Sequence, residues 1–367
     1  MRLMISGGGT GGHVYPALAV ADWLTTASPR PATLCWVGSA GGVEESLVTR
    51  AGLPFEGIPA AGLRGRNPLA MAKGLATLGR GFWQARRLVR VFQPDVLLVT
   101  GGYVCVPVTL AAWLARVPVL IYLPDMQPGL AIKFLARLAD RVAVTAPPAV
   151  RHFRPGQAVV TGYPVRRQLF ERGRDEAQAQ LGLSTRTDEL PVLLVFGGSQ
   201  GAHSINQAVC EGIEVLLEQA QVVHISGPRD AEWTRARQET LPENLRARYH
   251  VYPYLHEEMV DALLAADLVV SRAGASTLGE FPAAGLPAVL VPYPHAGAHQ
   301  WDNARYLVEA GAAVAIADAE LGRELLPTVL GLLADSDRRA SMRQAARGLA
   351  RPEAAERIAS ELKELAQ

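Results

Sequence analysis

The sequence lacks the marks of a disulfide-stapled, metal-binding or nucleic-acid-binding protein. It has only three cysteines in 367 residues, Cys35, Cys105 and Cys210, and no pair of them has metal-ligand spacing. They lie in separate apolar runs, which predicts reduced core residues of a cytosolic protein. With a formal net charge of +1 the chain is a poor candidate for general nucleic-acid binding, which requires a broad basic surface.

A long uninterrupted apolar run is also missing. The most apolar stretch, residues 106–123, contains Arg116 and is punctuated by Pro107 and Pro118, so it predicts a buried helix and a buried strand rather than a membrane span. Met1 leads directly into a short strand and a glycine loop, and we therefore expect no signal peptide. With 49% apolar and 19% charged residues the chain is typical of a globular protein, and its length is typical of two domains.

What the sequence does contain is a repeated alternation of strand and helix patterns. Runs of Val, Ile and Leu between helical patterns indicate an α/β architecture, with parallel sheets covered on both faces. The expected strands are 2–6, 34–38, 95–100, 118–123, 141–145 and 158–162, and then, after residue 190, 192–196, 221–226, 250–254, 267–271, 288–291 and 313–317.

Both halves of the chain begin with the same kind of motif. ISGGGTGGH at 5–13 and VFGGSQGAH at 195–203 each consist of an apolar strand, a glycine turn and the start of a helix. This internal echo predicts two Rossmann-like domains, which we place at 1–163 and 164–345. The last segment, 346–367, contains the pattern of an amphipathic helix, and we expect it to return to the first domain.

The first glycine loop favours a diphosphate or sugar ligand. Gly7, Gly9 and Gly12 fit G-x-G-x-x-G between a strand and a helix, where glycine lets a ligand approach the backbone and helix N–H groups attract negative charge. A P-loop would need Gly-Lys-Ser/Thr, but this loop ends in Gly-Gly-His. Strand two ends in Gly-Ser-Ala-Gly at 38–41, without the acid that NAD binding requires, which argues against a dehydrogenase. The alternative is that these glycines only form tight turns.

His13 stands where this loop becomes a helix. At the carboxyl end of strand one it would face a ligand, and an imidazole can take a proton from a hydroxyl group near neutral pH. The alternative is a structural histidine or a helix cap, and the residues alone leave both interpretations open.

The segment SRAGASTLGE at 271–280 is the most informative part of the second half. A strand ends at Ser271, small residues follow, and a helix begins near Ser276, so its N-terminus suits a diphosphate. Glu280 lies one turn into this helix, where a carboxylate can accept two hydrogen bonds from a ribose diol. The alternative is a solvated helix acid.

Polar residues recur at the next junction of loop and helix, HAGAHQWDN at 295–303. His299, Gln300 and Asn303 offer the neutral donors and acceptors that sugar hydroxyls need. His295 and His299 have no evident third ligand, so we predict no metal site.

Taken together, seven segments resemble the MurG family, the UDP-N-acetylglucosamine:undecaprenyl-diphospho-muramoyl-pentapeptide N-acetylglucosaminyltransferases of peptidoglycan synthesis. The resemblance runs nearly end to end. The segments are GGGTGGHVYPALAVA at 7–21, TGGYVCVP at 100–107, GYPVR at 162–166, FGGSQGA at 196–202, SRAGASTLGE at 271–280, AAGLPAVLVPY at 283–293 and HQWDNA at 299–304.

The resemblance implies a GT-B fold, in which two Rossmann-like domains with parallel sheets face an interdomain cleft. It implies inverting transfer of N-acetylglucosamine from UDP-N-acetylglucosamine, with no metal or other cofactor, to the 4-hydroxyl of lipid-linked N-acetylmuramoyl-pentapeptide, converting lipid I to lipid II. The first domain would hold the acceptor and the second the UDP-sugar. The family belongs to bacterial cell-wall biogenesis, cell shape and division, and acts peripherally on the cytoplasmic face of the cell membrane.

The resemblance also implies residue roles in the first domain. His13 becomes the leading candidate for the base that activates the acceptor hydroxyl. The other substrate-binding candidates of this domain, near the donor sugar or the acceptor, are Thr10, Gly11, Gly12, Tyr103 and Asp125.

In the second domain the implied roles concern the donor. Glu280 would bind the ribose, and the backbone near His256 would hold the uracil. The diphosphate would be approached by Arg166, Ser199 and Gln200 and by N–H groups of Ala275, Ser276 and Thr277, with Leu278 and Gly279 completing that segment. His299 and Gln300 would contact N-acetylglucosamine, with Asn303 as a further candidate.

Two positions depart from the family pattern. Where the family usually has His-Glu-Gln-Asn after the fourth strand of the first domain, this chain has Tyr-Leu-Pro-Asp at 122–125, so Asp125 occupies the Asn position. Where the family usually has Asn before Pro-Val-Arg, this chain has Tyr163. Because Asp125 lies on the acceptor side, the departure bears on the acceptor and not on the donor.

A basic segment suggests a membrane-facing helix. Between Glu56 and Asp95 there is no acid, but there are seven basic residues, Arg64, Arg66, Lys73, Arg80, Arg86, Arg87 and Arg90. On a helix, one face would carry Leu75, Leu78, Phe82, Ala85 and Val89, and the opposite face would carry Lys73, Arg80 and Arg87. Such a helix can rest on an anionic membrane, and the alternative is a core-packed helix with a solvated basic face.

Three other functions remain open from the sequence. They are a related glycosyltransferase that acts on another lipid such as a diacylglycerol, a UDP-N-acetylglucosamine 2-epimerase with the same two-domain fold, and a non-catalytic scaffold that keeps a nucleotide pocket. Intact His13 and Glu280 argue against the scaffold.

Overall fold

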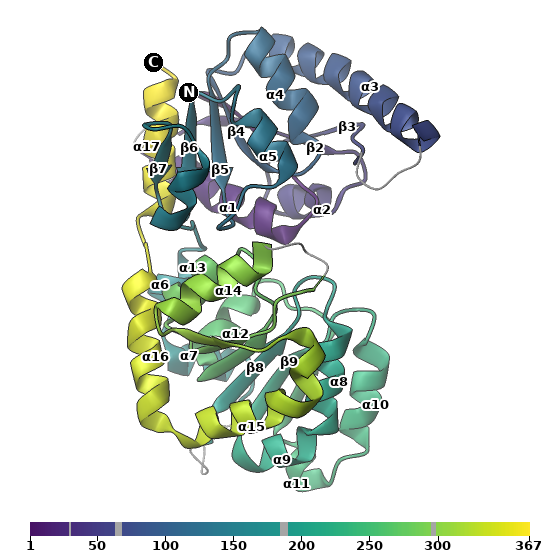
Figure 1. The fold of residues 1–367 in the computed structure, drawn as a ribbon, viewed down its shortest axis with the longest axis vertical. Helices are drawn as coiled ribbons and strands as arrows, with labels where there is room; N and C mark the ends of the chain where they lie inside the picture. The colour runs from purple at the N-terminus through teal and green to yellow at the C-terminus, as the bar shows by residue number, and fades with distance from the viewer. Residues whose placement is uncertain (29–30, 63–67, 184–189, 295–298) are drawn as a thin grey trace. The chain divides into compact units, whose positions relative to one another are not determined.

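The computed structural model describes residues 1–28, 31–62, 68–183, 190–294 and 299–367 (Figure 1). The chain forms two compact units. The first comprises Met1–Val165 together with Arg351–Gln367, and the second comprises Arg166–Ala350.

A parallel seven-stranded sheet forms the centre of the first unit. Its strand order is β3-β2-β1-β4-β5-β6-β7, and its middle strands are fully buried because they are continuous runs of Val, Leu and Ile that helices cover on both faces. The strands are β1 Arg2–Gly7, β2 Thr33–Ser39, β3 Phe55–Ile58, β4 Val96–Gly101, β5 Val119–Leu123, β6 Arg141–Val144 and β7 Ala158–Val160.

The edge strand β3 was absent from the sequence prediction. It is four residues long, and only Ile58 is fully buried, while Glu56 and Gly57 are exposed. Such a strand has no continuous apolar run, so it forms only because β2 offers a free edge to pair with.

Helices cover this sheet, and the last of them comes from the end of the chain. They are α1 Gly11–Asp22, the π-helical turn Trp23–Ala27, α2 Val43–Arg50, α3 Pro68–Phe92, α4 Cys105–Leu114, α5 Leu130–Leu135, the 3-10 turn Pro147–His152 and α17 Ala354–Leu365.

The C-terminal helix α17, yellow in Figure 1, packs against α1 and β5 of the first unit. Its apolar stripe of Ala354, Ile358, Ala359 and Leu362 is buried. Burial of each large aliphatic side chain contributes about 1.5–3 kcal/mol. Outside that stripe, Arg141 forms ion pairs with Glu361 and Glu364, so the helix is held by both apolar and ionic contacts.

The second unit repeats the plan with a parallel six-stranded sheet of order β10-β9-β8-β11-β12-β13. The expected parallel α/β architecture is thus confirmed in both units. The strands are β8 Val192–Phe196, β9 Gln221–Ile225, β10 Tyr249–Tyr252, β11 Leu268–Ser271, β12 Ala288–Leu290 and β13 Ala313–Ala315. The helical elements are α6 Gln168–Glu171, α7 Arg174–Gln180, α8 His203–Glu211, α9 Ile213–Gln219, α10 Ala231–Glu239, α11 Glu243–Arg246, α12 Met259–Ala265, α13 Thr277–Ala284, α14 His299–Glu309, the 3-10 turn Asp318–Glu320, α15 Leu321–Ala334 and α16 Ser336–Leu349.

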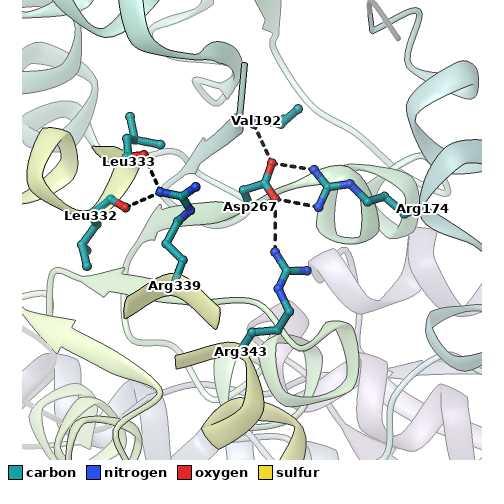
Figure 2. A network of polar contacts seen from close by, with 7 residues as sticks. All are labelled: Arg174, Val192, Asp267, Leu332, Leu333, Arg339 and Arg343. Atoms are coloured by element: carbon teal, nitrogen blue, oxygen red, sulfur yellow. Dashed lines mark hydrogen bonds and ion pairs between the residues drawn. The ribbon is translucent and has the colours of Figure 1, made fainter. Parts of the chain in front are cut away.

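An ionic network ties the amino ends of two strands of this second sheet to its helices (Figure 2). Asp267, just before β11, accepts from both guanidinium nitrogens of Arg174 at 2.7 and 2.5 Å, from Arg343 at 3.1 Å and from the backbone N–H of Val192 at 2.9 Å. Burial alone would raise the pKa of Asp267, but these hydrogen bonds and the two positive charges outweigh it and lower the pKa. The network therefore fixes α7 and α16 at the edge opposite to the strand ends that carry the glycine motifs.

Both sheets reverse their strand order at one point, between β1 and β4 in the first unit and between β8 and β11 in the second. In open parallel sheets, the loops that leave the carboxyl ends of the strands at such a reversal form the ligand site. The loops there are those after Gly7 and Gly101 in one unit and after Phe196 and Ser271 in the other. The topology thus places both glycine motifs, and the segment after β11, at the strand reversals.

Candidate functional site

Two glycine segments interlock at the strand reversal of the first unit. The backbone N–H of Gly8 donates to the carbonyl of Gly101 at 3.0 Å. A Cβ atom on Gly102 would lie 2.6 Å from the carbonyl oxygen of Gly8, and Gly102 has a φ of +94°. Glycine is therefore required here by close backbone contact as well as by the backbone angle.

His13 lies in the first turn of α1, over this interlocked backbone. Its Nδ1 is 3.1 Å from the carbonyl oxygen of Gly8, which can only accept, so Nδ1 carries the hydrogen. The ring lies against Gly101, where a Cβ atom would come within 3.0 Å of Nε2. In the neutral imidazole, Nε2 then has the free lone pair that a general base needs.

A buried acid that sequence reasoning missed supports the same loop. Glu44, in the first turn of α2, is 1% exposed. One carboxylate oxygen accepts from the N–H of Gly9 at 3.0 Å, and the other accepts from the N–H of Ser39 at 2.8 Å. Glu44 does not stand at the end of strand two, where NAD-binding folds carry their acid, but comes five residues after Ser39 and reaches back to the loop. An acid in the first turn of the next helix was the available signal.

The remaining first-unit candidates differ in their exposure and in their contacts. Thr10 is exposed, and its carbonyl accepts from the N–H of His13 at 3.1 Å, while Gly11 and Gly12 are half-buried. Tyr103 is 50% exposed, and its ring leaves no room for a Cβ atom on Gly62. Asp125 is half-buried just beyond β5.

The two departures from the family pattern contact each other. The rings of Tyr122 and Tyr163 pack edge to face with centroids 6.2 Å apart. The hydroxyl of Tyr122 pairs with that of Thr145 at 2.8 Å, and the hydroxyl of Tyr163 donates to the carbonyl of Gly12 at 3.4 Å. Burial raises the pKa of Tyr122 well above 10, so its hydroxyl stays protonated. Tyr122 and Tyr163 thus pack as one pair, and the Tyr163 hydroxyl links that pair to the first glycine loop.

In the second unit the glycine loop closes as a tight backbone turn. The N–H of Gly201 donates to the carbonyl of Gly198 at 2.9 Å. A Cβ atom on Gly201 would lie 2.2 Å from the carbonyl oxygen of Ser226, so this turn packs directly against the loop after β9. Ser199 and Gln200, which the family resemblance assigns to the diphosphate, lie at the exposed tip of the turn.

The segment between β11 and α13 forms a series of backbone turns. Thr277 N–H donates to Gly274 at 3.1 Å, Leu278 to Ala275 at 3.1 Å and Gly279 to Ser276 at 3.1 Å. The N–H of Thr277, one of the three groups assigned to the phosphates, therefore already has a backbone acceptor. Ala275 and Leu278 are buried apolar residues, and Ser276 is half-buried at the N-cap of α13.

Glu280, Arg166 and His256 come together in the second unit. The Glu280 side chain is buried, and a guanidinium nitrogen of Arg166 lies 3.6 Å from its carboxylate. A second Arg166 nitrogen donates to the backbone carbonyl of His256 at 3.1 Å. Burial raises the pKa of Glu280 above its ordinary 4.5, and the charge of Arg166 and a hydrogen bond from Ser276 offset part of that effect. The structure thus groups three residues that the sequence places far apart.

The polar residues of α14 differ in what they contact. His299 and Gln300 are half-buried, and the Gln300 side-chain oxygen accepts from the N–H of Tyr293 at 2.8 Å. Asn303 is fully buried, and its amide donates to the carbonyl of Ala273 at 3.1 Å. Its polar group therefore holds the segment before α13 in place and does not face solvent. His295 lies outside the described residues.

The basic helix of the first unit, α3, exposes apolar side chains beside its positive charges. Ala85 and Val89 of the expected apolar face are buried and Leu78 and Phe82 are half-buried, but Leu75 is 56% exposed. Other large apolar side chains that α3 and the adjoining α4 expose are Met71, Trp83, Val91, Trp113 and Leu114. Lys73, Arg80 and Arg87 are also exposed, whereas Arg64 and Arg66 lie outside the described residues. In the described parts of the chain, no helix is both long and apolar enough to span a membrane.

Comparison with known proteins connects both units to one activity. Residues 3–144 match the glycosyltransferase family 28 N-terminal domain, and residues 192–358 match the glycosyltransferase family 28 C-terminal domain. A UDP-N-acetylglucosamine–N-acetylmuramyl-(pentapeptide) pyrophosphoryl-undecaprenol N-acetylglucosamine transferase of Roseiflexus sp. strain RS-1 is 44% identical, with 98% of this chain and 94% of the relative covered. The transferase of the same name from Desulforudis audaxviator is also 44% identical, over 100% of this chain and 99% of the relative. The chain belongs to this transferase family.

A solved structure of the same transferase family supports the fold. MurG of Acinetobacter baumannii superposes with a TM-score of 0.75 at 28% identity and covers 99% of each chain. The MurG resemblance and the GT-B fold expected from the sequence are thereby confirmed. A UDP-GlcNAc 2-epimerase from Neisseria meningitidis reaches a TM-score of 0.67 at 13% identity over 99% of this chain and 100% of its own, a likeness that shows the fold alone.

Proposed function

We propose that this protein transfers N-acetylglucosamine from UDP-N-acetylglucosamine to the 4-hydroxyl of lipid-linked N-acetylmuramoyl-pentapeptide, which converts lipid I to lipid II in peptidoglycan synthesis. The observation that carries the proposal is full-length relationship, 44% identity over 98–100% of the chain, to transferases with that name. The fold alone would not suffice, because the epimerase shares it.

The reaction would be a single displacement with inversion at C1 of the sugar. The acceptor oxygen forms a bond to C1 while the bond from C1 to the diphosphate oxygen breaks, and UDP leaves with the electron pair. His13 Nε2 takes the proton of the attacking hydroxyl, and the hydrogen bond from Nδ1 to Gly8 fixes the ring for that transfer. The enzyme then holds an imidazolium, which returns its proton to solvent.

The donor would bind to the second unit. Glu280 is buried beside Arg166, and its carboxylate would accept both ribose hydroxyls, while Arg166 would turn toward the diphosphate. The His256 backbone would hold the uracil, Ser199 and Gln200 would meet the phosphates at the exposed turn, and His299 and Gln300 would contact the sugar. In this scheme Arg166 and the N-terminus of α13 carry the leaving-group charge, and no metal ion takes part.

The acceptor is a lipid, so we propose that the first unit rests on the cytoplasmic face of the membrane. The exposed Trp83 and Leu75 would enter the interface, and Lys73, Arg80 and Arg87 would attract anionic headgroups. This assignment makes the protein peripheral.

Radiolabelled UDP-N-acetylglucosamine with lipid I in detergent micelles tests the activity. We expect label to move into a product of lipid II mobility, with no transfer to diacylglycerol. Transfer to diacylglycerol in preference to lipid I would identify another lipid as the acceptor. Formation of an epimer from donor alone, without transfer, would replace the proposal by the epimerase reaction.

A further inference from the structure

Glu44 is a buried carboxylate that the reaction scheme above does not use. It is 1% exposed, and both of its oxygens accept backbone N–H groups, those of Gly9 and Ser39. Among the described residues no cation forms an ion pair with it, so its burial is costly, and two charge-assisted hydrogen bonds offset that cost. The backbone around it is therefore arranged to hold a negative charge.

Three surrounding glycines leave room for the Glu44 side chain. A Cβ atom on Gly8 would lie 2.1 Å from a Glu44 oxygen. On Gly42 it would lie 2.6 Å from the Glu44 carboxyl carbon, and on Gly38 it would lie 2.9 Å from Glu44 Cγ. Three glycines from the loop after β1, from β2 and from the start of α2 thus all lie against Glu44, and at Gly38 the ring of Phe55 is closer still, at 2.5 Å.

One peptide group connects Glu44 to His13. The N–H of the peptide between Gly8 and Gly9 donates to Glu44 at 3.0 Å, and the carbonyl of that same peptide accepts from His13 Nδ1 at 3.1 Å. Hydrogen bonds in such a chain polarise one another, so the carboxylate makes the carbonyl a stronger acceptor. The carboxylate of Glu44 is thus linked to the imidazole of His13 through one peptide group. In a Ser-His-Asp triad an acid orients the catalytic histidine in the same way, but by a direct hydrogen bond.

We propose that Glu44 is a positioning residue for His13 and acts through this peptide. It holds the Gly8 carbonyl in place, fixes hydrogen on Nδ1 and stabilises the imidazolium that forms when Nε2 accepts the acceptor proton. Glu44 itself exchanges no proton. The inference rests on the proposed function, in which His13 is the base.

The first test is Glu44→Gln. The amide NH2 of glutamine would face either Gly9 N–H or Ser39 N–H, so one of the two hydrogen bonds is lost at nearly constant volume. We expect kcat to fall by about 10- to 100-fold, a part of what a positioned base contributes, while KM for UDP-N-acetylglucosamine changes less than about twofold. Glu45→Gln is the matched control, because Glu45 lies on the same turn, is exposed and accepts from Gly41 N–H at 3.0 Å. It should keep full activity.

A double-variant cycle separates a role through His13 from general support of the fold. In a His13→Ala background, Glu44→Gln should lower the residual turnover by less than about twofold, because the group through which it acts is gone. An equal loss in both backgrounds would overturn the proposal. If His13→Ala alone keeps normal turnover, the proposed base is wrong. If His13→Ala is impaired while Glu44→Gln in the parent is fully active, only the role of Glu44 is wrong.

Nitrogen NMR of labelled histidine gives a readout independent of turnover. The parent should show His13 with hydrogen on Nδ1, and Glu44→Gln should mix the two tautomers. If the glutamine variant does not fold, Glu44→Asp keeps the charge at the start of α2 but shortens its reach by one methylene, and the same loss of kcat is expected. Full activity of a folded Glu44→Asp variant with an altered tautomer, or an unchanged tautomer in both variants, would contradict the inference.

Discussion

The two units carry similar glycine motifs, and each unit contains a buried glutamate with a different kind of partner. In the first unit Glu44 lies behind the loop, and backbone N–H groups occupy both of its oxygens. In the second unit Glu280 lies 3.6 Å from Arg166, and burial raises its pKa. One carboxylate is committed to the backbone of its own loop, while the other faces a cation and can exchange that contact for ligand hydroxyls.

This difference suits the two similar folds to different parts of the proposed reaction. A negative charge held behind the first loop opposes a diphosphate there and supports an imidazole instead. The second loop closes through the Gly201-to-Gly198 turn, with Ser199 and Gln200 at its exposed tip. We therefore expect variants of the first unit to change chemistry and variants of the second to change donor binding.

The largest effect should come from His13→Ala. Loss of the proposed base should lower kcat by about 10²- to 10⁴-fold, while calorimetry should show unchanged UDP binding because the proposed donor contacts belong to the second unit. Unchanged turnover would remove His13 from the mechanism, and lost UDP binding would break the division between the units.

Glu280→Ala should give the converse result. Loss of hydrogen bonds from ribose hydroxyls to a charged acceptor costs about 1.5–3 kcal/mol, so Kd for UDP should rise about 10- to 100-fold. Glu309→Ala, an exposed glutamate of α14, is the control. UDP affinity of the parent should also fall on acidification, beginning above pH 4.5, because the raised pKa of Glu280 means that its carboxylate is protonated earlier than an ordinary one. A pH-independent Kd between pH 4 and 7 would contradict the ribose assignment.

Asp267→Asn should lower the stability of the fold and leave both glycosyl transfer and UDP binding intact. Breaking this partly buried ionic network should lower the free energy of unfolding by about 2 kcal/mol at pH 7, less than for a fully buried pair. The folded pKa of Asp267 lies below its ordinary 3.8, so the parent has this stabilisation above that pH and loses it as the pH falls through the depressed value. Urea unfolding at pH 7 and at pH 3 measures both effects, with exposed Asp337→Asn as the control. Loss of donor binding by a folded Asp267→Asn variant would show that this edge of the sheet is not separate from the site.

The smallest effect should come from Arg80→Gln combined with Arg87→Gln. Each basic residue near an anionic surface contributes at most about 1 kcal/mol, so sedimentation with anionic vesicles at low salt should show roughly tenfold weaker binding. Arg235→Gln with Arg246→Gln removes two exposed arginines of the second unit and should have no effect. If the parent itself ignores such vesicles, the first unit is not the membrane-facing half.

Tyr122 and Tyr163 show that two separate departures from a family pattern can form a single contact in the structure. In the sequence, Tyr122 and Tyr163 are two separate departures from a family pattern. In the structure their rings pack together, and Tyr163 reaches the carbonyl of Gly12 beside His13. Residues 41 positions apart cannot be paired from one sequence, because no local pattern connects them.

Local order was readable from the sequence because it depends on short-range chemistry. Runs of Val, Leu and Ile gave the central strands of both sheets, glycine turns followed by helix starts gave the two loops, and the stripe on Ala354–Leu365 gave the last helix. The edge strand β3 was missed because its residues have no apolar pattern of their own.

Only the tertiary structure decided which polar groups are used by the fold and which are available for ligands. In the structure the Asn303 amide donates to the carbonyl of Ala273, and Glu280 lies beside Arg166. Glu44 accepts a hydrogen bond from Gly9 in the loop that precedes His13. The physical reason is that the role of a polar side chain depends on its burial and its partners, and both are set by chain segments far away in sequence.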